Sequence, residues 1–374
     1  NGDTNDKHDV FVHDRFTGET ERVSVASDGK QGNDTSWGPS ISADGRIVAF
    51  SSAANLGAQP QATWNIFVHD RITGETTLVS ISSDGTPANE SSMTQPAISA
   101  SGHIIAFESE ATNLVAGDLN NVADIFIHDL QSGETTRVSV ASDGTEANNY
   151  SSAPALSADG RYVAFASGAS NLFANDTNGV YDVFIHDRQT GETTLISTRL
   201  EGVGISQDAH LPAVSADGRR VAFMSRSSDL VTGDTGDADI FVYDRMTGTL
   251  DLVSVGSNGE KGNGDSDRLA ISADGLRIAF DSRAANLVPG DTNDAGDVFV
   301  HNLVTGETSR VSVGDNGDQG NGSSFAVGIS PDGLVVGFAS DASNLVLNDT
   351  NNEDDVFLRI EFLEAARMYL PMTR

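Results

Sequence analysis

Residues 282–302 read SRAANLVPGDTNDAGDVFVHN, and versions of this stretch recur along the whole chain. The stretch begins where an apolar strand ends, passes through an aspartate-rich loop at 290–297, and enters a second strand at 298–301. A unit that recurs at a fixed period defines the architecture of a chain, so the repeat has to be understood before any single motif.

The last position of each acidic loop marks the period, and the residue two places later is always phenylalanine. These positions are Asp9, Asn65, Asp124, Asp182, Asp239, Asp297 and Asp355. They recur at a nearly constant interval of about 58 residues, and a period of this size is typical of β-propellers and solenoids.

Each full repeat contains four strand-like segments, which we call the first to fourth strand in chain order. In one repeat they lie at 153–157, 161–167, 182–187 and 194–197. Asp159-Gly160 and Thr190-Gly191 connect neighbouring strands, and glycine accepts the positive φ that tight hairpin turns require. Loops from the second to the third strand and from the fourth to the next first strand should leave on the same face.

The turn between the first and second strands occurs six times. Its copies are Asp44-Gly45, Ser101-Gly102, Asp159-Gly160, Asp217-Gly218, Asp274-Gly275 and Asp332-Gly333. Four antiparallel strands per repeat then predict an all-β, six-bladed β-propeller, with the ring closed by N- and C-terminal strands. Residues 1–360 would form this single domain, and residues 361–374 a C-terminal tail or an extra strand.

Phenylalanine follows the repeat. Of 17 phenylalanines, 13 fall on second or third strands, where large apolar side chains are usually buried. They are Phe50, Phe107, Phe165, Phe223, Phe280 and Phe338 on second strands, and Phe11, Phe67, Phe126, Phe184, Phe241, Phe299 and Phe357 on third strands. We expect these rings to form the core between blades.

The segment ISADGRIVAFSS at 41–52, followed by a DIFVHD-type strand, resembles the WD40-like repeat of TolB-type propellers. That repeat carries Ser-Pro-Asp-Gly, a strand ending in Ala-Phe, and then Asp-Ile-Tyr. Residues 330–333 match Ser-Pro-Asp-Gly fully, and other copies mostly read Ser-Ala-Asp-Gly. The resemblance covers nearly the whole chain. It implies the fold but no single function, since such propellers serve as periplasmic partner-binding proteins, peptidase accessory domains and carbohydrate-active enzymes.

The two ends of the chain supply surplus strands. Residues 9–14 and 21–25 resemble a third and a fourth strand, and residues 355–360 resemble another third strand. The simplest closure makes 21–25 the fourth strand of the last blade, which removes an open edge. Alternatively, 367–372 takes that place and leaves the N-terminal hairpin spare. A spare hairpin could join subunits into a homo-oligomer by strand addition.

The acidic loops share the form Asp-x-Asn-x-x-x-Asp. Oxygen-bearing side chains at positions 1, 3 and 7 of a short loop suit Ca²⁺, which takes six to eight oxygen ligands. The candidate metal ligands are Asp3, Asn5, Asp9, Asp118, Asn120, Asp124, Asp176, Asn178, Asp182, Asp234, Asp239, Asp291, Asn293, Asp297, Asp349, Asn351 and Asp355. This pattern predicts structural calcium.

Turn formation is the alternative role for these residues, because Asp and Asn also cap backbone N–H groups. Two carboxylates at the ends of one short loop favour metal, because they repel unless something positive lies between them. The divergent copy at 59–65 has no aspartate and should be empty. The copy at 234–239 is one residue shorter. With no cysteine and no grouped histidines, no softer metal is favoured.

The formal charge of −32 and a pI of about 4.3 exclude nucleic acid and anionic membranes as favourable partners. No apolar run of membrane-spanning length occurs. The chain begins at Asn1 without a visible signal peptide, so we expect a processed form of a secreted or cell-surface protein.

His-Asp dipeptides at 13–14, 69–70, 128–129 and 186–187 resemble acid–base pairs. Neighbours on a strand point to opposite faces, so the histidine cannot orient on the adjacent aspartate. An enzyme needs a site that differs between repeats. The residues that differ are His210 with Asp208, and Trp37, Trp64 and His103.

Three functions remain open. The first is a non-catalytic binding or assembly module that presents the acidic loop face to a protein or polysaccharide. The second is a carbohydrate-active enzyme, a lyase or hydrolase, with its site at the central channel. The third is a self-assembling subunit joined through terminal strands. No nucleophile elbow and no phosphate-binding glycine loop is present.

Overall fold

The computed structural model describes residues 3–57, 63–174, 176–198, 205–232, 236–347, 349–351 and 353–360. The predicted ligand Asp234 and the tail at 361–374 lie outside these residues, as does most of the divergent loop at 59–65. In the described chain, no helix is long and apolar enough to cross a membrane.

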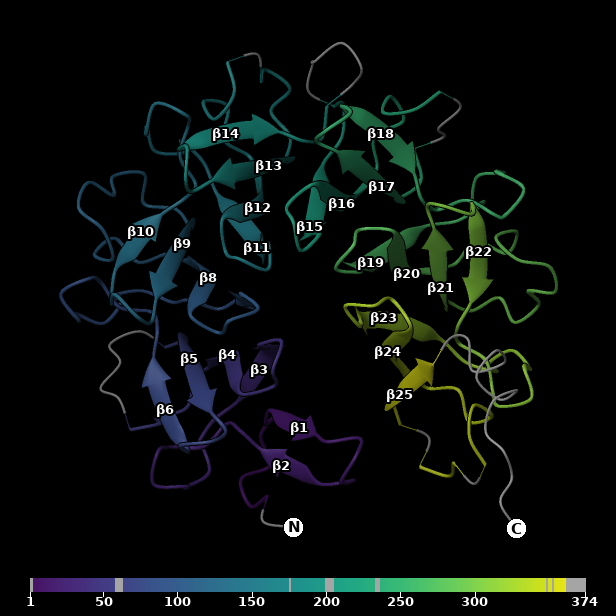
Figure 1. Cartoon of the computed structure of the whole chain (residues 1–374), viewed down its shortest axis with the longest axis horizontal. Helices are drawn as coiled ribbons and strands as arrows, with labels where there is room; N and C mark the ends of the chain where they lie inside the picture. Colours follow the sequence, from purple (N-terminus) through teal and green to yellow (C-terminus); the bar gives the residue numbers. More distant parts are fainter. Residues whose placement is uncertain are drawn as a thin grey trace. The chain divides into compact units, whose positions relative to one another are not determined.

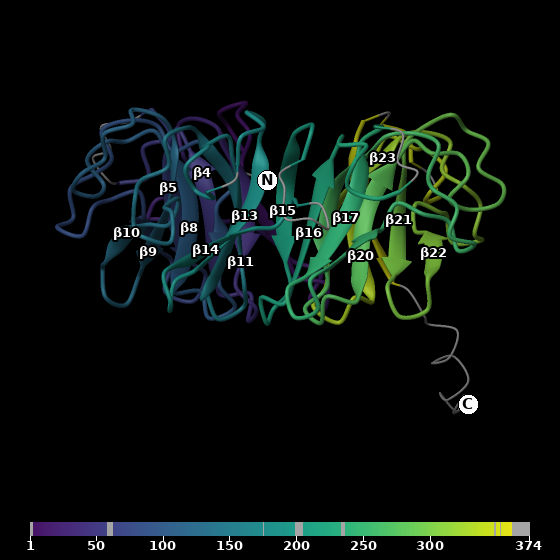
Figure 2. The same cartoon turned by 90° about the horizontal axis from the view of Figure 1, so that it is seen from above.

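The chain divides into two compact units, residues 1–196 and 197–374. Figure 1 shows that each unit consists of small sheets built from strands that are consecutive in the chain. In a side view, the strands of each unit run between two layers of connecting loops (Figure 2).

The first unit holds fourteen of the described strands. They are β1 (Phe11–His13), β2 (Thr20–Arg22), β3 (Ser36–Ile41), β4 (Ile47–Ser52), β5 (Asn65–Asp70), β6 (Glu75–Leu78), β7 (Ala97–Ile98), β8 (Ile104–Ser109), β9 (Asp124–Asp129), β10 (Thr135–Arg137), β11 (Ser151–Leu156), β12 (Tyr162–Ser167), β13 (Asp182–Asp187) and β14 (Glu192–Leu195).

The second unit holds the other eleven described strands. They are β15 (Ala209–Val214), β16 (Arg220–Ser225), β17 (Asp239–Asp244), β18 (Thr249–Leu252), β19 (Ser266–Ile271), β20 (Arg277–Ser282), β21 (Asp297–Asn302), β22 (Glu307–Arg310), β23 (Ser324–Ile329), β24 (Val335–Ser340) and β25 (Asp355–Ile360).

Five sheets contain four antiparallel strands in chain order, such as β11-β12-β13-β14, and a sixth contains β23-β24-β25. These six sheets are the blades of the predicted all-β, six-bladed propeller. The third strand of the repeat used as an example, β13, matches the predicted 182–187. Its first strand begins two residues earlier than predicted, at Ser151, and its fourth strand spans Glu192–Leu195 instead of 194–197.

The terminal pairing differs from the one expected. Strand β2 hydrogen-bonds to β1 in a separate two-stranded sheet, while residues 21–25 were expected in the last blade. The turn between them explains why the pair stays together. Gly18 N–H donates to the Asp14 carbonyl at 2.8 Å, and Asp14 Oδ1 accepts the N–H groups of Phe16 and Thr17. The rival segment 367–372 lies outside the described residues.

Hydrogen bonds explain the Ser-x-Asp-Gly signature of the turn between first and second strands. Ser157 Oγ donates to Asp159 Oδ1 at 2.6 Å and accepts the N–H of Tyr162 at 2.9 Å. Gly160 has φ +71°, and a Cβ there would lie 2.9 Å from the Ile104 side chain of the neighbouring sheet. The turn therefore requires these residue types at these positions.

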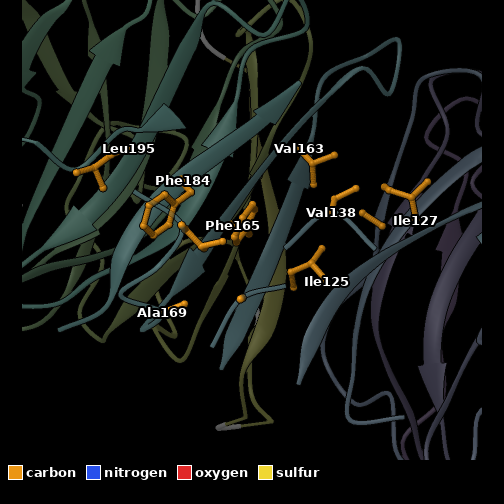
Figure 3. Packing of buried hydrophobic residues seen from close by; sticks show 11 residues of the cluster. Ile125, Ile127, Val138, Val163, Phe165, Ala169, Phe184 and Leu195 are labelled. Carbon is orange, nitrogen blue, oxygen red and sulfur yellow. The ribbon is translucent and has the colours of Figure 1, made fainter. Parts of the chain in front are cut away.

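The core lies between neighbouring sheets, as the phenylalanine pattern predicts. Phe165 on β12 stacks on Phe184 of β13 with ring centroids 5.9 Å apart, and both rings are fully buried. Figure 3 shows them in one cluster with Leu195, and with Ile125 and Ile127 from the preceding sheet. Each blade thus depends on its neighbour for burial of its apolar face.

Phe11 departs from this prediction, because its side chain is 51% exposed. In the full blades, a phenylalanine on the second strand stacks on the one on the third strand. The two-stranded sheet of β1 and β2 has no second strand, so Phe11 lacks that partner ring and contacts the guanidinium of Arg22 at 5.9 Å.

Candidate functional site

The acidic loop between β20 and β21 folds around a basic side chain of its own repeat. Arg310, at the end of β22, places Nη1 3.2 Å from Asp297 Oδ2 and 3.6 Å from Asp291 Oδ1. Gln319 Nε2 donates to a carboxylate oxygen of each aspartate at 2.8 Å. The guanidinium supplies the positive charge that two neighbouring carboxylates require.

Two other loops contain the same arrangement. Arg22 Nη1 lies 2.7 Å from Asp9 Oδ2, and Arg137 Nη1 lies 3.4 Å from Asp124 Oδ2. In all three repeats the arginine follows the last aspartate of the loop by 13 residues. Because the third and fourth strands form a hairpin, this spacing brings the arginine back beside the aspartate.

The loop before β17 is neutralised from a different position. Leu252 stands at the arginine position of this repeat, and Lys261 stands at the position that Gln319 occupies in its own repeat. Lys261 places Nζ 2.8 Å from Asp239 Oδ2. The predicted first ligand of this loop, Asp234, lies outside the described residues. A fixed basic side chain therefore contacts the last aspartate in four repeats.

The loop before β9 gathers the most acidic groups. Oxygen atoms of Asp118, Asp124 and Glu146 lie within 4.8 Å of one another, with Arg137 Nη1 2.5 Å from Glu146 Oε1. Burial and the nearby charge of Asp124 raise the pKa of Asp118 to about 6. Burial also raises the pKa of Asp124. Three carboxyl groups surround one guanidinium, so the positive charge of Arg137 does not balance all of them, and the charge of this cluster favours a further cation.

The asparagine at the third loop position forms a turn in every repeat where it is described. Asn120 Oδ1 accepts the N–H of Val122 at 3.0 Å, and its Nδ2 donates to Asp124 Oδ2 at 2.9 Å. The matching contact from Oδ1 to the N–H two residues later occurs at Asn5, Asn178, Asn293 and Asn351. The side-chain oxygen of this asparagine is thus engaged by the loop backbone, which is the turn role.

The loop before β13 differs from the arginine-containing ones. Leu195 occupies the arginine position of this repeat. Asp176 is 5% exposed, and its Oδ1 has no hydrogen-bond partner among the residues that the structure describes. Asn178 Nδ2 donates to Asp182 Oδ2 at 2.7 Å. Burial raises the pKa of Asp176.

The remaining two acidic loops are the divergent loop at 59–65 and the last loop at 349–355. In the divergent loop, Asn65 replaces the last aspartate and Leu78 occupies the arginine position, so the acid and the base are missing together. In the last loop, Asn351 Nδ2 donates to Asp355 Oδ2 at 3.1 Å. Asp349 lies within the described residues, whereas the segment after β25 does not.

The repeated histidines contact threonine side chains on the next strand of their own sheet. His128 Nδ1 lies 2.8 Å from Thr135 Oγ1, and this hydroxyl donates to the Ile81 carbonyl of the neighbouring sheet at 2.5 Å. Because the threonine proton is used in that bond, His128 Nδ1 is the donor. The same histidine–threonine contact occurs at His13–Thr20, His69–Thr76, His186–Thr193 and His301–Thr308. The histidines therefore hold the scaffold together and do not orient on the adjacent aspartates.

One position varies between repeats while its surroundings stay the same. A buried serine or alanine begins or precedes each first strand, and the residue after it differs in every copy. These residues are Trp37, Met93, Ser152, His210, Asp267 and Phe325. In five copies the N–H of the buried serine donates to the residue just before the end of the acidic loop, and that residue also varies.

Trp37, at one of these variable positions in the first unit, lies against a second tryptophan. The rings of Trp37 and Trp64 lie edge to face with centroids 6.2 Å apart. Trp37 is 46% exposed and Met93 is 48% exposed. Ser92 N–H donates to the Trp64 carbonyl, and Gln95 Nε2 donates to a carbonyl near Trp37, that of Pro39. We call Trp37, Trp64, Met93 and Gln95 the tryptophan patch.

His210, Asp208 and His103, the other residues that differ between repeats, lie away from the tryptophan patch along the chain. His210 Nε2 lies 3.9 Å from Asp208 Oδ2, which is an ion-pair distance and longer than a hydrogen bond. His103 is exposed in the turn before β8, where its N–H donates to Ser101 Oγ at 3.4 Å. The contacts described thus place His210 beside a carboxylate and His103 in a turn.

The sequence prediction missed the basic partners of the acidic loops. The signal was present as the same spacing from aspartate to arginine in three copies. Leucine stands at the arginine position in the copies that end at Asn65, Asp182 and Asp239. Reading the loops alone hides this signal, because the arginine lies on the next strand.

Solved structures with the same fold are similar to most of this chain. An oligogalacturonate lyase solved in complex with manganese matches with a TM-score of 0.57 and 16% identity, over 96% of this chain and 84% of that one. The β-propeller domain of the Trilobed protease from Pyrococcus furiosus matches with a TM-score of 0.52 and 14% identity, over 86% and 80%. At such identities, the likeness shows the β-propeller fold alone.

TolB from Acinetobacter baumannii also matches, with a TM-score of 0.47 and 16% identity. The match covers 80% of this chain, which spans 60% of that TolB. The sequence matches no protein-family model and none of the curated proteins with which it was compared.

Proposed function

We propose that this protein is a non-catalytic binding module that acts outside the cytoplasm and recognises a polysaccharide through the tryptophan patch. The observation that carries the proposal is the contrast between repeats. Histidine, serine and aspartate recur and are engaged in hydrogen bonds within the scaffold, whereas the variable positions carry unlike side chains. Of these, Trp37, Met93 and Asp267 are exposed, and the other three are half-buried. Exposed side chains that vary on a constant scaffold are suited to recognition.

The chemistry of the patch favours a neutral polysaccharide. The two tryptophans of the chain are both in it, and an indole ring can stack against the C–H face of a sugar ring. The amide of Gln95, which is exposed, adds a polar group beside the rings. A net charge of −32 repels anionic polymers, so a neutral ligand fits better.

The proposal includes structural calcium at the acidic loop face. The loops supply carboxylates and backbone carbonyls, which are hard oxygen ligands of the kind that Ca²⁺ prefers. Supporting features are the cluster of Asp118, Asp124 and Glu146, and a buried oxygen of Asp176 that has no hydrogen-bond partner within the described chain. Thermal unfolding with EDTA and then with excess Ca²⁺ tests this part, because a cation that binds the folded state raises its Tm.

Gel electrophoresis in the presence of soluble polysaccharides tests recognition. We expect retardation by at least one neutral polymer from a panel of a β-glucan, a mannan and an α-glucan. Trp37→Ala should weaken that binding more than about tenfold, since truncating a central aromatic side chain costs about 2 kcal/mol or more. Ile72→Ala is the matched control, because Ile72 is 75% exposed in the turn between β5 and β6.

Two results would overturn this function. Retardation by none of the neutral polymers would remove the saccharide ligand and leave the protein ligand as the interpretation. Shortening of polygalacturonate or of a neutral polymer during incubation would show an enzyme instead of a binding module.

A further inference from the structure

The acidic loop before β9 differs from two other acidic loops of the chain in one partner residue. All three loops begin and end with aspartate, and an arginine follows the last aspartate by 13 residues. The residue nine places after that arginine is Gln31 in the first loop, Gln319 in the loop before β21 and Glu146 in the loop before β9. The chain thus contains the same site with a side-chain amide and with a carboxylate.

In the two loops that have glutamine, the side-chain amide bridges the aspartates. Gln319 Nε2 donates to Asp291 Oδ1 and to Asp297 Oδ2, each at 2.8 Å. Gln31 Nε2 makes the equivalent two bonds in the first loop, at 2.8 and 3.0 Å. Each aspartate therefore receives an N–H donor, and one guanidinium faces two carboxylates.

Glu146 cannot make these bonds, because an ionised carboxylate only accepts hydrogen bonds. Asp118 Oδ1, the counterpart of Asp291 Oδ1, is buried and has no hydrogen-bond partner within the described chain. The Asp118 side chain is only 2% exposed. Residues 63–174, which contain all four side chains of this site, are described without a gap. The replacement of glutamine by glutamate thus leaves a buried carboxylate oxygen open.

The site also holds more negative charge than its arginine can balance. Arg137 Nη1 lies 2.5 Å from Glu146 Oε1. Its distances to Asp124 Oδ2 and Asp118 Oδ1 are longer, 3.4 and 3.7 Å. Oxygen atoms of the three carboxylates lie within 4.8 Å of one another. Three carboxylates and one guanidinium leave two negative charges in excess, and such charge is costly to bury unless a cation compensates it.

We propose that Asp118, Asp124 and Glu146 bind one Ca²⁺ ion, which takes the place of the bridging amide N–H groups in the two loops that have glutamine. The inference rests on the structural-calcium part of the proposed function and narrows it to this loop. A divalent cation balances the two excess negative charges. The three carboxylates supply hard oxygen ligands, and loop carbonyls and water can complete the six to eight oxygens that Ca²⁺ takes.

Counting bound Ca²⁺ by titration calorimetry tests the assignment, near neutral pH and in about 0.15 M KCl, which screens the exposed carboxylates. Glu146→Gln should lower the number of bound Ca²⁺ ions by one. This variant should fold, because glutamine is the native residue at the equivalent position of two other loops. Gln319→Glu creates the same set of four side chains in the loop before β21 and should raise the number by one.

Glu134→Gln is the matched control. It removes one exposed carboxylate from the turn before β10 and should leave the number of bound Ca²⁺ ions unchanged. Thermal unfolding gives a second readout. In EDTA, Glu146→Gln should have a higher Tm than the parent, because the variant buries less uncompensated charge. Excess Ca²⁺ should then raise the Tm of the parent more than that of the variant.

Equal Ca²⁺ counts in the parent and in Glu146→Gln would overturn the proposal and favour a proton shared between the carboxyl groups. Absence of an added ion in Gln319→Glu would overturn it as well. A parent whose Tm responds to EDTA and Ca²⁺ keeps the structural-calcium part even in those cases. Polysaccharide retardation is measured separately at the tryptophan patch, so failure of this inference is distinguishable from failure of the proposed function.

Discussion

At the scale of single residues, three of the first strands contain a bulge in which one residue has a left-handed conformation. Gly38, Ala153 and Leu211 have φ of 59°, 53° and 52°, and the strand register shifts at each of them. Non-glycine residues in this region cost roughly 1–2 kcal/mol. The bulge thus stores strain on the strands that carry the variable positions.

The bulge predicts opposite effects for two substitutions. Gly38→Ala should destabilise the fold by about 2 kcal/mol, because the new Cβ lies 3.0 Å from Gln95 Cα in addition to the φ cost. Ala153→Gly should change the free energy of unfolding by less than about 0.5 kcal/mol, because relief of strain offsets the added freedom of the unfolded chain. Chemical denaturation of both variants measures this, and equal losses would contradict it.

Glu108 gives a pH-dependent prediction. Its side chain is 5% exposed, accepts a hydrogen bond from Tyr150 Oη, and has a pKa raised by burial above its ordinary 4.5. The folded state then holds the proton more tightly than the unfolded state, so stability falls as pH rises from about 4.5 through the folded pKa.

Glu108→Gln should remove this dependence. The variant should gain Tm relative to the parent as pH rises through that window, because a neutral amide carries no buried charge. Glu110→Gln, an exposed neighbour, is the control. A constant Tm difference between Glu108→Gln and the parent at all pH values would refute the assignment.

At the scale of elements, the fourth strands are held to the preceding repeat by side chains. Thr135 Oγ1 accepts from His128 and donates to the Ile81 carbonyl, while Ser83 Oγ accepts the N–H of Thr135 and donates to its carbonyl. Comparable bonds link Thr76 to Ser27, Thr193 to Ser142 and Thr308 to Ser257. Neighbouring sheets are therefore joined by polar contacts at their outer strands.

Thr135→Val tests this link. The substitution should cost about 2–4 kcal/mol, because it leaves both the Ile81 carbonyl and a His128 N–H without partners in a buried place. Thr136→Val, a half-buried neighbour on β10, should cost less than about 1 kcal/mol. Thermal unfolding of the two variants measures the difference, and similar Tm values would argue against a role for the threonine bridge.

Much of the element structure could be predicted because it depends on local signals. The third strand at 182–187 follows an Asp-rich turn and is found as predicted, and the Asp-Gly turns lie where expected. The fourth strand begins earlier than predicted, because its pairing with β13 starts directly after the Gly191 turn. The predictions for Phe11 and for the partner of β2 were wrong, since both depend on which strands the chain ends provide.

At the scale of the whole molecule, charge dominates the behaviour expected in solution. A net charge of −32 places many carboxylates within one Debye length of each other at low salt. The self-repulsion destabilises the compact state, although individual pairs such as Arg161 with Asp187 oppose it.

Salt should therefore stabilise this protein. We expect Tm to rise as NaCl shortens the screening length from about 30 Å at 0.01 M to about 3 Å at 1 M. The measurement is made in EDTA, so that calcium does not contribute. A Tm that falls with NaCl would show that the surface ion pairs outweigh the repulsion.

The candidate site was predictable in its acids and unpredictable in their partners. The sequence indicated that two carboxylates such as Asp291 and Asp297 need a positive neighbour, and the structure places Arg310 beside both of them. Choosing between a metal and an arginine required reading each acidic loop together with the fourth strand, which the hairpin brings back beside it. The tryptophan patch likewise needed the register that brings residues 37 and 64 together.

The constant spacing from aspartate to arginine has a consequence for how such a chain can grow. Both members of the pair lie on one hairpin, such as β21 and β22, so duplication of a repeat that has this pair carries the compensating charge along with the acid. New copies can therefore be added or lost by recombination without leaving bare carboxylates in a buried loop. Divergence is then free to act on the residue after the buried serine and on the residue before the last position of the acidic loop.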